Sequence, residues 1–216
     1  ALTKNKEVKR WLNFISNHYL PKPTEVLLLY PCSAKKPYHA SRSYKKLYET
    51  LAKLGGLRSK IRIATISEPF GLIPEEFYGK KCKWHNWEES WYDCPGLFEW
   101  WCRKHKQPYS KALAHECFSI LASCVAKFLK KTKNKYKYRI AFIRSYTSHL
   151  NVTNSLTHRK IIEKASEISK IHVKILPPKR IIKKIVDMHG FLAWDLYGVA
   201  HSKAQSYLLN YLRSLM

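Results

Sequence analysis

The feature that most constrains the fold of this chain is a short apolar run, Val-Leu-Leu-Leu-Tyr, at residues 26–30. The run contains no polar position, so a strand built from it must be covered on both faces. Pro21 and Pro23 precede it, and a polar stretch with Pro31 and Pro37 follows it. These breakers limit the run to the length of a strand. We therefore predict a central strand of a parallel sheet, buried between helices.

Strand and helix patterns alternate along the rest of the chain. Three further strands are predicted at residues 61–66, 138–143 and 171–176. Helices are predicted at residues 9–20, 42–54 (with Ser41 as N-cap), 110–130, 155–170, 181–188 and 202–215. This alternation is typical of an α/β fold, and we expect a three-layer sandwich with a mainly parallel central sheet.

The length of the chain, 216 residues, favours a single domain. We predict one α/β domain over residues 1–216. Within it we expect an N-terminal helix in residues 1–22 and an irregular, aromatic-rich insertion at residues 77–109.

The charge of the chain indicates its class of partner. Forty Lys and Arg residues against fifteen Asp and Glu residues give a net charge of +25. The stretch from Lys127 to Lys184 holds seventeen of the basic residues and two acids. Such an excess is typical of proteins that neutralise the phosphates of a nucleic acid.

Neither a membrane span nor a signal peptide is predicted. The sequence has no uninterrupted run of 18 apolar residues, and Lys4, Lys6 and Glu7 interrupt any apolar stretch near its start. We expect a cytoplasmic protein with no membrane partner.

The loop after the first predicted strand carries candidate chemistry. Ligands of open parallel sheets bind at the carboxyl ends of strands, where this loop begins. Cys32 lies there with Lys35 and Lys36, just before a predicted helix. These neighbours predict a lowered thiol pKa and a nucleophilic cysteine. Two other interpretations stay open: the loop holds a phosphate, or Cys32 is a small packed side chain without chemistry.

Two later loops carry candidate carboxylates. Glu68 follows the second predicted strand, where it would bind amino donors of a purine-like base or act as an acid or base. Asp93 lies in a compact Tyr-Asp-Cys-Pro-Gly loop, as a general base or substrate anchor. For both residues the alternative is an ordinary turn position.

The residue types of a zinc site also occur, although their spacing is loose and the paired-cysteine pattern is missing. We expect no bound metal and no cofactor. The candidate ligands are Cys82, His85, Cys94, Cys102 and His105.

Three segments between residues 26 and 96 resemble motifs of a known family, the archaeosine synthases, which modify archaeal tRNA. The first segment, Pro-Cys-x3-Lys-Pro-Tyr-x2-Ser from Pro31 to Ser41, is similar to that family's signature, which ends in His where this chain has Tyr44. The second covers residues 67–76 and resembles a Ser-Pro-Leu-Gly-x-x-Pro-type block. The third, from Tyr92 to Pro95, resembles a Tyr-Asp-x-Pro block.

The resemblance implies a fold, a reaction and a site. The fold is the uracil-DNA glycosylase-like central domain of the family, which is similar to domains that hold an extruded base. The reaction adds an amine, in family terms lysine, to the nitrile of 7-cyano-7-deazaguanine in tRNA. Cys32, Glu68 and Asp93 are the implied catalytic residues. The implied substrate-binding residues are Ser33, Lys35, Lys36, Pro37, Tyr38, Ser41, Tyr44, Ser67, Pro69, Phe70, Gly71 and Tyr92.

The chain is too short for the family's transglycosylase barrel and PUA domain, so the resemblance is to a stand-alone or split form. The implied partners are tRNA, a separate tRNA-guanine transglycosylase or PUA-domain protein, and a radical-SAM enzyme. Two alternatives stay open: a DNA glycosylase acting on a flipped base, and a tRNA-binding subunit without catalytic activity.

Overall fold

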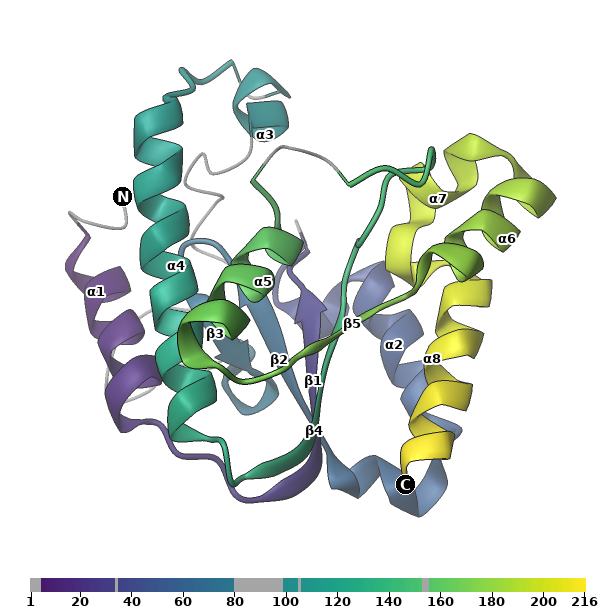
Figure 1. Ribbon diagram of the computed structural model, residues 1–216, viewed down its shortest axis with the longest axis horizontal. Coiled ribbons are helices and arrows are strands. Elements are labelled where there is room, and N and C mark those ends of the chain that lie inside the picture. Colours follow the sequence, from purple (N-terminus) through teal and green to yellow (C-terminus); the bar gives the residue numbers. More distant parts are fainter. Residues whose placement is uncertain (1–4, 34, 80–98, 105, 153–155) are drawn as a thin grey trace.

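A computed structural model describes residues 5–33, 35–79, 99–104, 106–152 and 156–216 (Figure 1). It contains a five-stranded sheet with the order β3-β2-β1-β4-β5. The pairs β1–β2, β1–β4 and β4–β5 are parallel, and β3 is antiparallel to β2. The strands are β1 (Thr24–Pro31), β2 (Ile61–Ser67), β3 (Gly71–Pro74), β4 (Tyr136–Phe142) and β5 (Lys174–Leu176). The predicted α/β class with a mainly parallel sheet is confirmed.

The central position of β1 follows from its apolar composition. Residues 26–30 have no exposed surface, and β1 pairs with β2 on one side and β4 on the other. Val26 lies beside both Ile61 and Tyr138 in this register. A strand without polar side chains is stable only where helices cover both of its faces.

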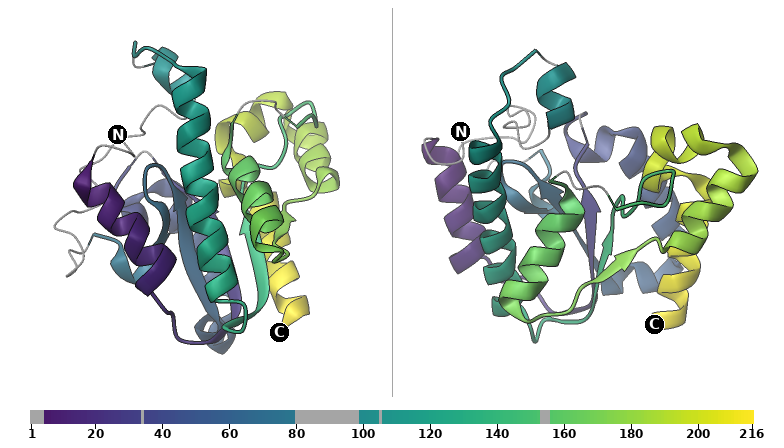
Figure 2. Two further views of the ribbon diagram at one scale, coloured as in Figure 1. Left: turned by 60° about the vertical axis from the view of Figure 1, so that its left-hand side comes forward. Right: turned by 45° about the horizontal axis from the view of Figure 1, so that its top comes forward.

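Helices cover the two faces of the sheet (Figures 1 and 2). One group packs along α4 and the other along α8. The first group contains α1 (Lys6–Asn13), which continues as a π-helical turn (Phe14–His18), α4 (Lys111–Lys131) and α5 (His158–Ser169). The second contains α2 (Arg42–Ala52), α6 (Lys179–His189), α7 (Phe191–Tyr197) and α8 (Ser202–Leu215). Buried residues from Val8 to Leu212 form one contiguous core.

Several predicted boundaries agree with the structure because local capping sets them. The Ser41 hydroxyl accepts a hydrogen bond from the Tyr44 N–H at 3.3 Å, and α2 begins directly after Ser41. Ser110 caps α4 in the same way, at 3.3 Å from the Leu113 N–H. The helix predicted at residues 155–170 begins at His158, because Thr157 is its N-cap.

Three elements were not predicted, namely β3, α3 (Glu99–Lys104) and α7. Residues 67–74 were expected to form a loop, yet Gly71–Pro74 pairs with β2. Gly71 has a φ of +68°, so the chain reverses within a few residues and returns along β2. The insertion predicted as irregular contains a helix in its described part, α3 (Glu99–Lys104), and residues 80–98 lie outside the described chain.

Helix α4 is long and apolar enough to cross a membrane by length and composition, with a mean hydropathy of 1.4. Half of that window is buried inside the fold, and α4 packs against α5 and the π-helical turn. These contacts are those of a core helix.

Substitution of Gly71 by alanine is expected to lower the free energy of unfolding by about 1–2 kcal/mol, because a side chain disfavours its left-handed backbone. The new Cβ would also lie 3.2 Å from the Cys124 sulfur. Chemical denaturation measures the loss. Gly56→Ala is the matched control, since no atom lies within 4 Å of its Cβ position. Equal stability of the two variants would contradict the prediction.

Candidate active site

Two of the motif loops meet at the carboxyl end of the sheet. Cys32 follows the last residue of β1, and Glu68 follows the last residue of β2. These strands are parallel neighbours, and the Cys32 N–H donates a hydrogen bond to the Ile66 carbonyl at 3.0 Å. The Cys32 Sγ lies 3.6 Å from Glu68 Oε2. Two residues 36 positions apart in the sequence therefore form one site.

A third functional side chain reaches this site from the other half of the chain. His158 is the first residue of α5, which follows β4, the other neighbour of β1. Its Nε2 lies 3.7 Å from Cys32 Sγ and 2.8 Å from Glu68 Oε1. We refer to Cys32, Glu68 and His158 as the Cys–Glu–His cluster.

No role was predicted for His158 from the sequence. A lone histidine carries no motif, and it lies 126 residues from Cys32 in the sequence. One signal was available: His158 directly follows an N-cap threonine, in the connection after a strand of the parallel sheet. Such connections pass the edge where ligands bind.

The cluster is largely shielded from water. The Glu68 side chain is 1% exposed and the His158 side chain is 16% exposed. Cys32 is half-buried. A carboxylate buried to this degree requires a positive partner or hydrogen-bond donors. The His158 imidazole lies close enough to Glu68 to serve as the positive partner when it is protonated.

Burial and charge set the protonation of the cluster. Burial raises the pKa of the Cys32 thiol, and the Glu68 carboxylate raises it further, against the opposing effects of His158 and Lys36. The predicted lowering of the Cys32 pKa was therefore wrong, because it considered the lysines and the helix end but not the buried carboxylate. Burial disfavours the charged imidazole, yet Glu68 holds the pKa of His158 well above its usual value. These directions favour the neutral thiol of Cys32 and the charged imidazolium of His158.

The cluster offers the donor types of a zinc site, and its three donor atoms lie within 4.8 Å of one another. A tetrahedral zinc ion would separate a nitrogen and an oxygen ligand by about 3.3 Å. The observed 2.8 Å between His158 Nε2 and Glu68 Oε1 is a direct contact between the two groups. The geometry therefore favours proton transfer over metal binding. Of the zinc candidates from the sequence, Cys102 is buried, and Cys82, His85, Cys94 and His105 lie outside the described residues.

Several residues implied as substrate-binding lie beneath the cluster and support the two loops. Tyr38 and Tyr44 have no exposed surface, and their rings stack with centroids 5.5 Å apart. The Tyr38 hydroxyl lies 2.8 Å from Ser67 Oγ, and the Tyr44 hydroxyl donates to the Pro31 carbonyl at 3.1 Å. Tyr44 also contacts the Thr65 hydroxyl. Tyr44, at the position of the family's histidine, therefore holds the ends of β1 and β2 together.

The second loop turns inward after Glu68. Pro69, Phe70 and Gly71 are buried, and the Trp11 indole N–H lies 3.1 Å from the carbonyls of both Phe70 and Leu72. These contacts anchor the segment that carries Glu68. Asp93 and Tyr92 lie outside the described residues.

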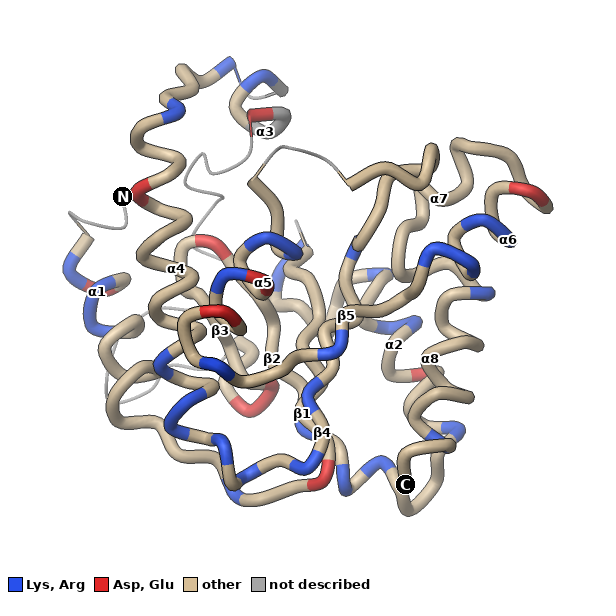
Figure 3. The backbone as a smooth tube through the Cα atoms, viewed as in Figure 1, with Lys and Arg blue, Asp and Glu red and all other residues tan. Residues whose placement is uncertain are grey.

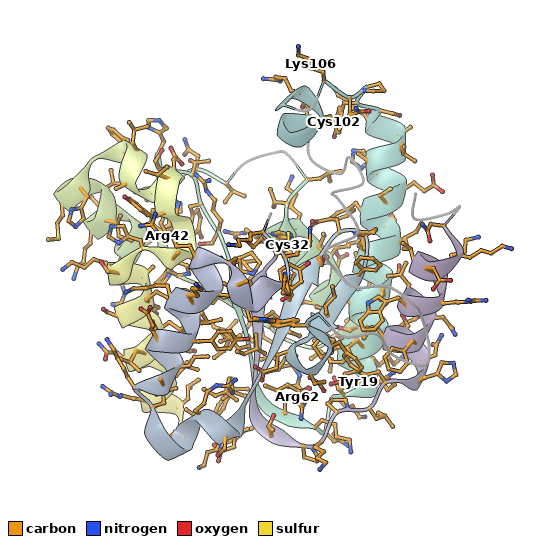
Figure 4. The ribbon with its side chains drawn as sticks, turned by 180° about the vertical axis from the view of Figure 1, so that it is seen from behind. Tyr19, Cys32, Arg42, Arg62, Cys102 and Lys106 are labelled. Atoms are coloured by element: carbon orange, nitrogen blue, oxygen red, sulfur yellow. The ribbon has the colours of Figure 1, made fainter. Side chains whose placement is uncertain are left out.

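Basic side chains lie in the loop that carries Cys32 and at the start of the helix that follows it. Lys35 is exposed, and Ser33, Lys36 and Pro37 are half-buried in the same loop. Arg42, at the start of α2, is exposed, and Figure 4 shows it at about the same height in the molecule as Cys32. Further Lys and Arg residues lie in the turn between α4 and β4, at the opposite edge of the sheet, and along α6, which follows the carboxyl end of β5 (Figure 3). This placement favours a phosphate-bearing ligand that extends beyond the cluster.

Comparison with known proteins identifies relatives of this chain. Residues 8–85, which include Cys32 and Glu68, match a family model described as a domain of unknown function, DUF5591. The archaeosine synthase subunit alpha of Thermococcus kodakarensis is 44% identical over 80 residues, which cover 36% of this chain and 14% of that protein. The protein of the same name from Thermoplasma acidophilum is 24% identical over 190 residues, which cover 86% of this chain and 32% of that protein.

A third relative with this name, from Methanosarcina acetivorans, is 32% identical over 119 residues, which cover 50% of this chain and 18% of that protein. The crystal structure of AF0587, a protein of unknown function, superposes on 95% of this chain and 48% of its own, with a TM-score of 0.49 and 18% identity. The chain thus spans less than a third of the length of these three curated relatives. The resemblance to the archaeosine synthases is confirmed.

Proposed function

We propose that this chain, as a relative of the archaeosine synthases, is a catalytic domain or subunit that adds lysine to the nitrile of 7-cyano-7-deazaguanine in tRNA. The observation that carries the proposal is the 3.6 Å approach of Cys32 and Glu68, which lie in two motif loops within the family-matched residues. The name that these relatives share, archaeosine synthase subunit alpha, supports the pathway.

The chemistry of a nitrile suits a cysteine at this position. The nitrile carbon is a mild electrophile, and a thiol that adds across the C≡N bond gives a thioimidate. An amine then attacks the same carbon and releases the sulfur, which leaves an amidine on the base. Asp93, outside the described residues, remains a proposed third catalytic residue of this reaction.

The charge of the molecule supports tRNA as the partner. Its net charge is +25, and Lys179, Arg180, Lys183 and Lys184 are all exposed on α6. We further propose that the sheet edge holds an extruded base, as in the uracil-DNA glycosylase-like fold. The proposed companions are a transglycosylase or PUA-domain protein and a radical-SAM enzyme, all acting in the cytoplasm.

Transfer of labelled lysine to tRNA tests the proposal. The protein is incubated with tRNA that carries 7-cyano-7-deazaguanine and with radiolabelled lysine, and the tRNA is then separated and counted. We expect label on this tRNA and none on the same tRNA with guanine at that position. Cys32 adducts with the modified base are sought in parallel by intact-protein mass spectrometry. Absence of both the label and the adduct, or base release from a uracil-containing duplex instead, would overturn the proposal.

A further inference from the structure

We propose that His158 is the acid that protonates the nitrile nitrogen, while Glu68 accepts the proton of the Cys32 thiol. This inference rests on the proposed function and assigns the proton transfers of its first step. It gives a catalytic role to a residue that lies outside every motif of the sequence and outside the family-matched residues 8–85.

The orientation of the Glu68 carboxylate separates the two roles. Its Oε1 lies 2.8 Å from His158 Nε2, and its Oε2 lies 3.6 Å from Cys32 Sγ. One oxygen therefore lies beside the imidazole nitrogen and the other lies beside the thiol sulfur. A single buried carboxylate connects both groups.

The position of His158 suits a general acid that protonates the nitrile nitrogen. A nitrile carbon ready for attack lies about 3–3.5 Å from the sulfur. His158 Nε2 is 3.7 Å from the same sulfur. The nitrile nitrogen is bonded to that carbon. When it is directed toward α5, it comes within hydrogen-bond reach of His158 Nε2.

The charge state of His158 decides whether this residue acts as the acid or as the base. The carboxylate of Glu68 favours the imidazolium, which has a proton to donate and no lone pair with which to accept one. An imidazolium does not deprotonate Cys32. The thiol has a raised pKa, so it needs a base at the moment of attack, and Glu68 Oε2 faces it.

The first step then balances in protons and electrons. The S–H bond breaks and its proton passes to Glu68, while the sulfur electron pair forms the C–S bond. One π bond of the nitrile breaks, and its electron pair takes the proton from His158 Nε2. Neutral imidazole and protonated carboxyl then exchange a proton across their 2.8 Å contact, which restores the original pair.

The second step releases the enzyme. The neutral amine attacks the thioimidate carbon and forms a C–N bond. The C–S bond breaks, and the sulfur takes up the proton that the amine loses, so the thiol is regenerated. No metal, oxidant or reductant enters either step.

Substitution of His158 by glutamine tests the inference in a single-turnover measurement of Cys32 adduct formation on the nitrile-bearing tRNA. We expect the rate to fall by about 10²–10⁴-fold, the usual contribution of a general acid. The dissociation constant for tRNA should stay within about twofold, because no contact with the phosphate backbone is removed. His115→Gln, at an exposed position on α4, is the matched control with an unchanged rate.

A second variant separates catalysis from structure. His158→Ala leaves space for a small molecule, so added imidazole should restore part of the lost rate, which it would not do for a merely structural defect. A wild-type rate in His158→Gln, or a loss of tRNA binding that accompanies the loss of rate, would overturn the inference. A wild-type protein that forms no adduct and transfers no lysine would instead overturn the proposed function.

Discussion

Replacement of Cys32 by serine is expected to reduce lysine transfer to cyano-deazaguanine tRNA by about 10⁴-fold or more, as for other enzymes that lose their nucleophile. A serine hydroxyl is a far weaker nucleophile than a thiol, and here the general base is a carboxylate that suits the more acidic thiol. The measurement is the single-turnover rate with labelled lysine. Affinity for tRNA should be unchanged, since the basic side chains that bind phosphate remain.

A matched control comes from another cysteine of this chain. Cys117 is buried on α4 and is not part of the Cys–Glu–His cluster, so Cys117→Ala should keep the wild-type rate. Lysine transfer by Cys32→Ser at a rate near that of the wild type would show that the thiol forms no covalent intermediate. The reaction would then be direct addition of the amine, with the domain as a scaffold.

Replacement of Trp11 by alanine is expected to lower the free energy of unfolding by about 3–5 kcal/mol, the usual cost of deleting a large buried aromatic side chain. Trp11 has no exposed surface, and its ring contacts Phe14 and Phe77 at centroid distances of 5.5 and 5.4 Å. Its loss also leaves the carbonyls of Phe70 and Leu72 without the indole donor, 3.1 Å away.

Denaturant unfolding measures this change, and Trp11→Phe separates its two causes. Phenylalanine keeps most of the apolar volume but removes the N–H donor, so about 1–3 kcal/mol should be lost from the missing hydrogen bonds and the smaller ring. Because Phe70 follows Glu68 by two residues, we also expect both variants to lose activity below their unfolding temperature. A Trp11→Ala variant as stable as the wild type would show that the segment after Glu68 is held by other contacts.

Local sequence patterns determined much of the scaffold of this protein. The apolar run at residues 26–30 required burial on both faces, so its place at the centre of a parallel sheet was predictable. Ser41 and Ser110 set helix starts through hydrogen bonds that span three residues. The meeting of Cys32 and Glu68 followed from the rule that adjacent parallel strands end at one edge.

Only the tertiary structure decided what the site is made of and how it is charged. His158 joins Cys32 and Glu68 because β4 pairs with β1 and because α5 begins at that edge, and no local pattern encodes a contact across 126 residues. The direction of the Cys32 pKa shift depends on burial and on a carboxylate 3.6 Å away. Local sequence sets hydrogen bonds between near neighbours, whereas desolvation and charge interactions depend on distances in space that only the folded chain fixes.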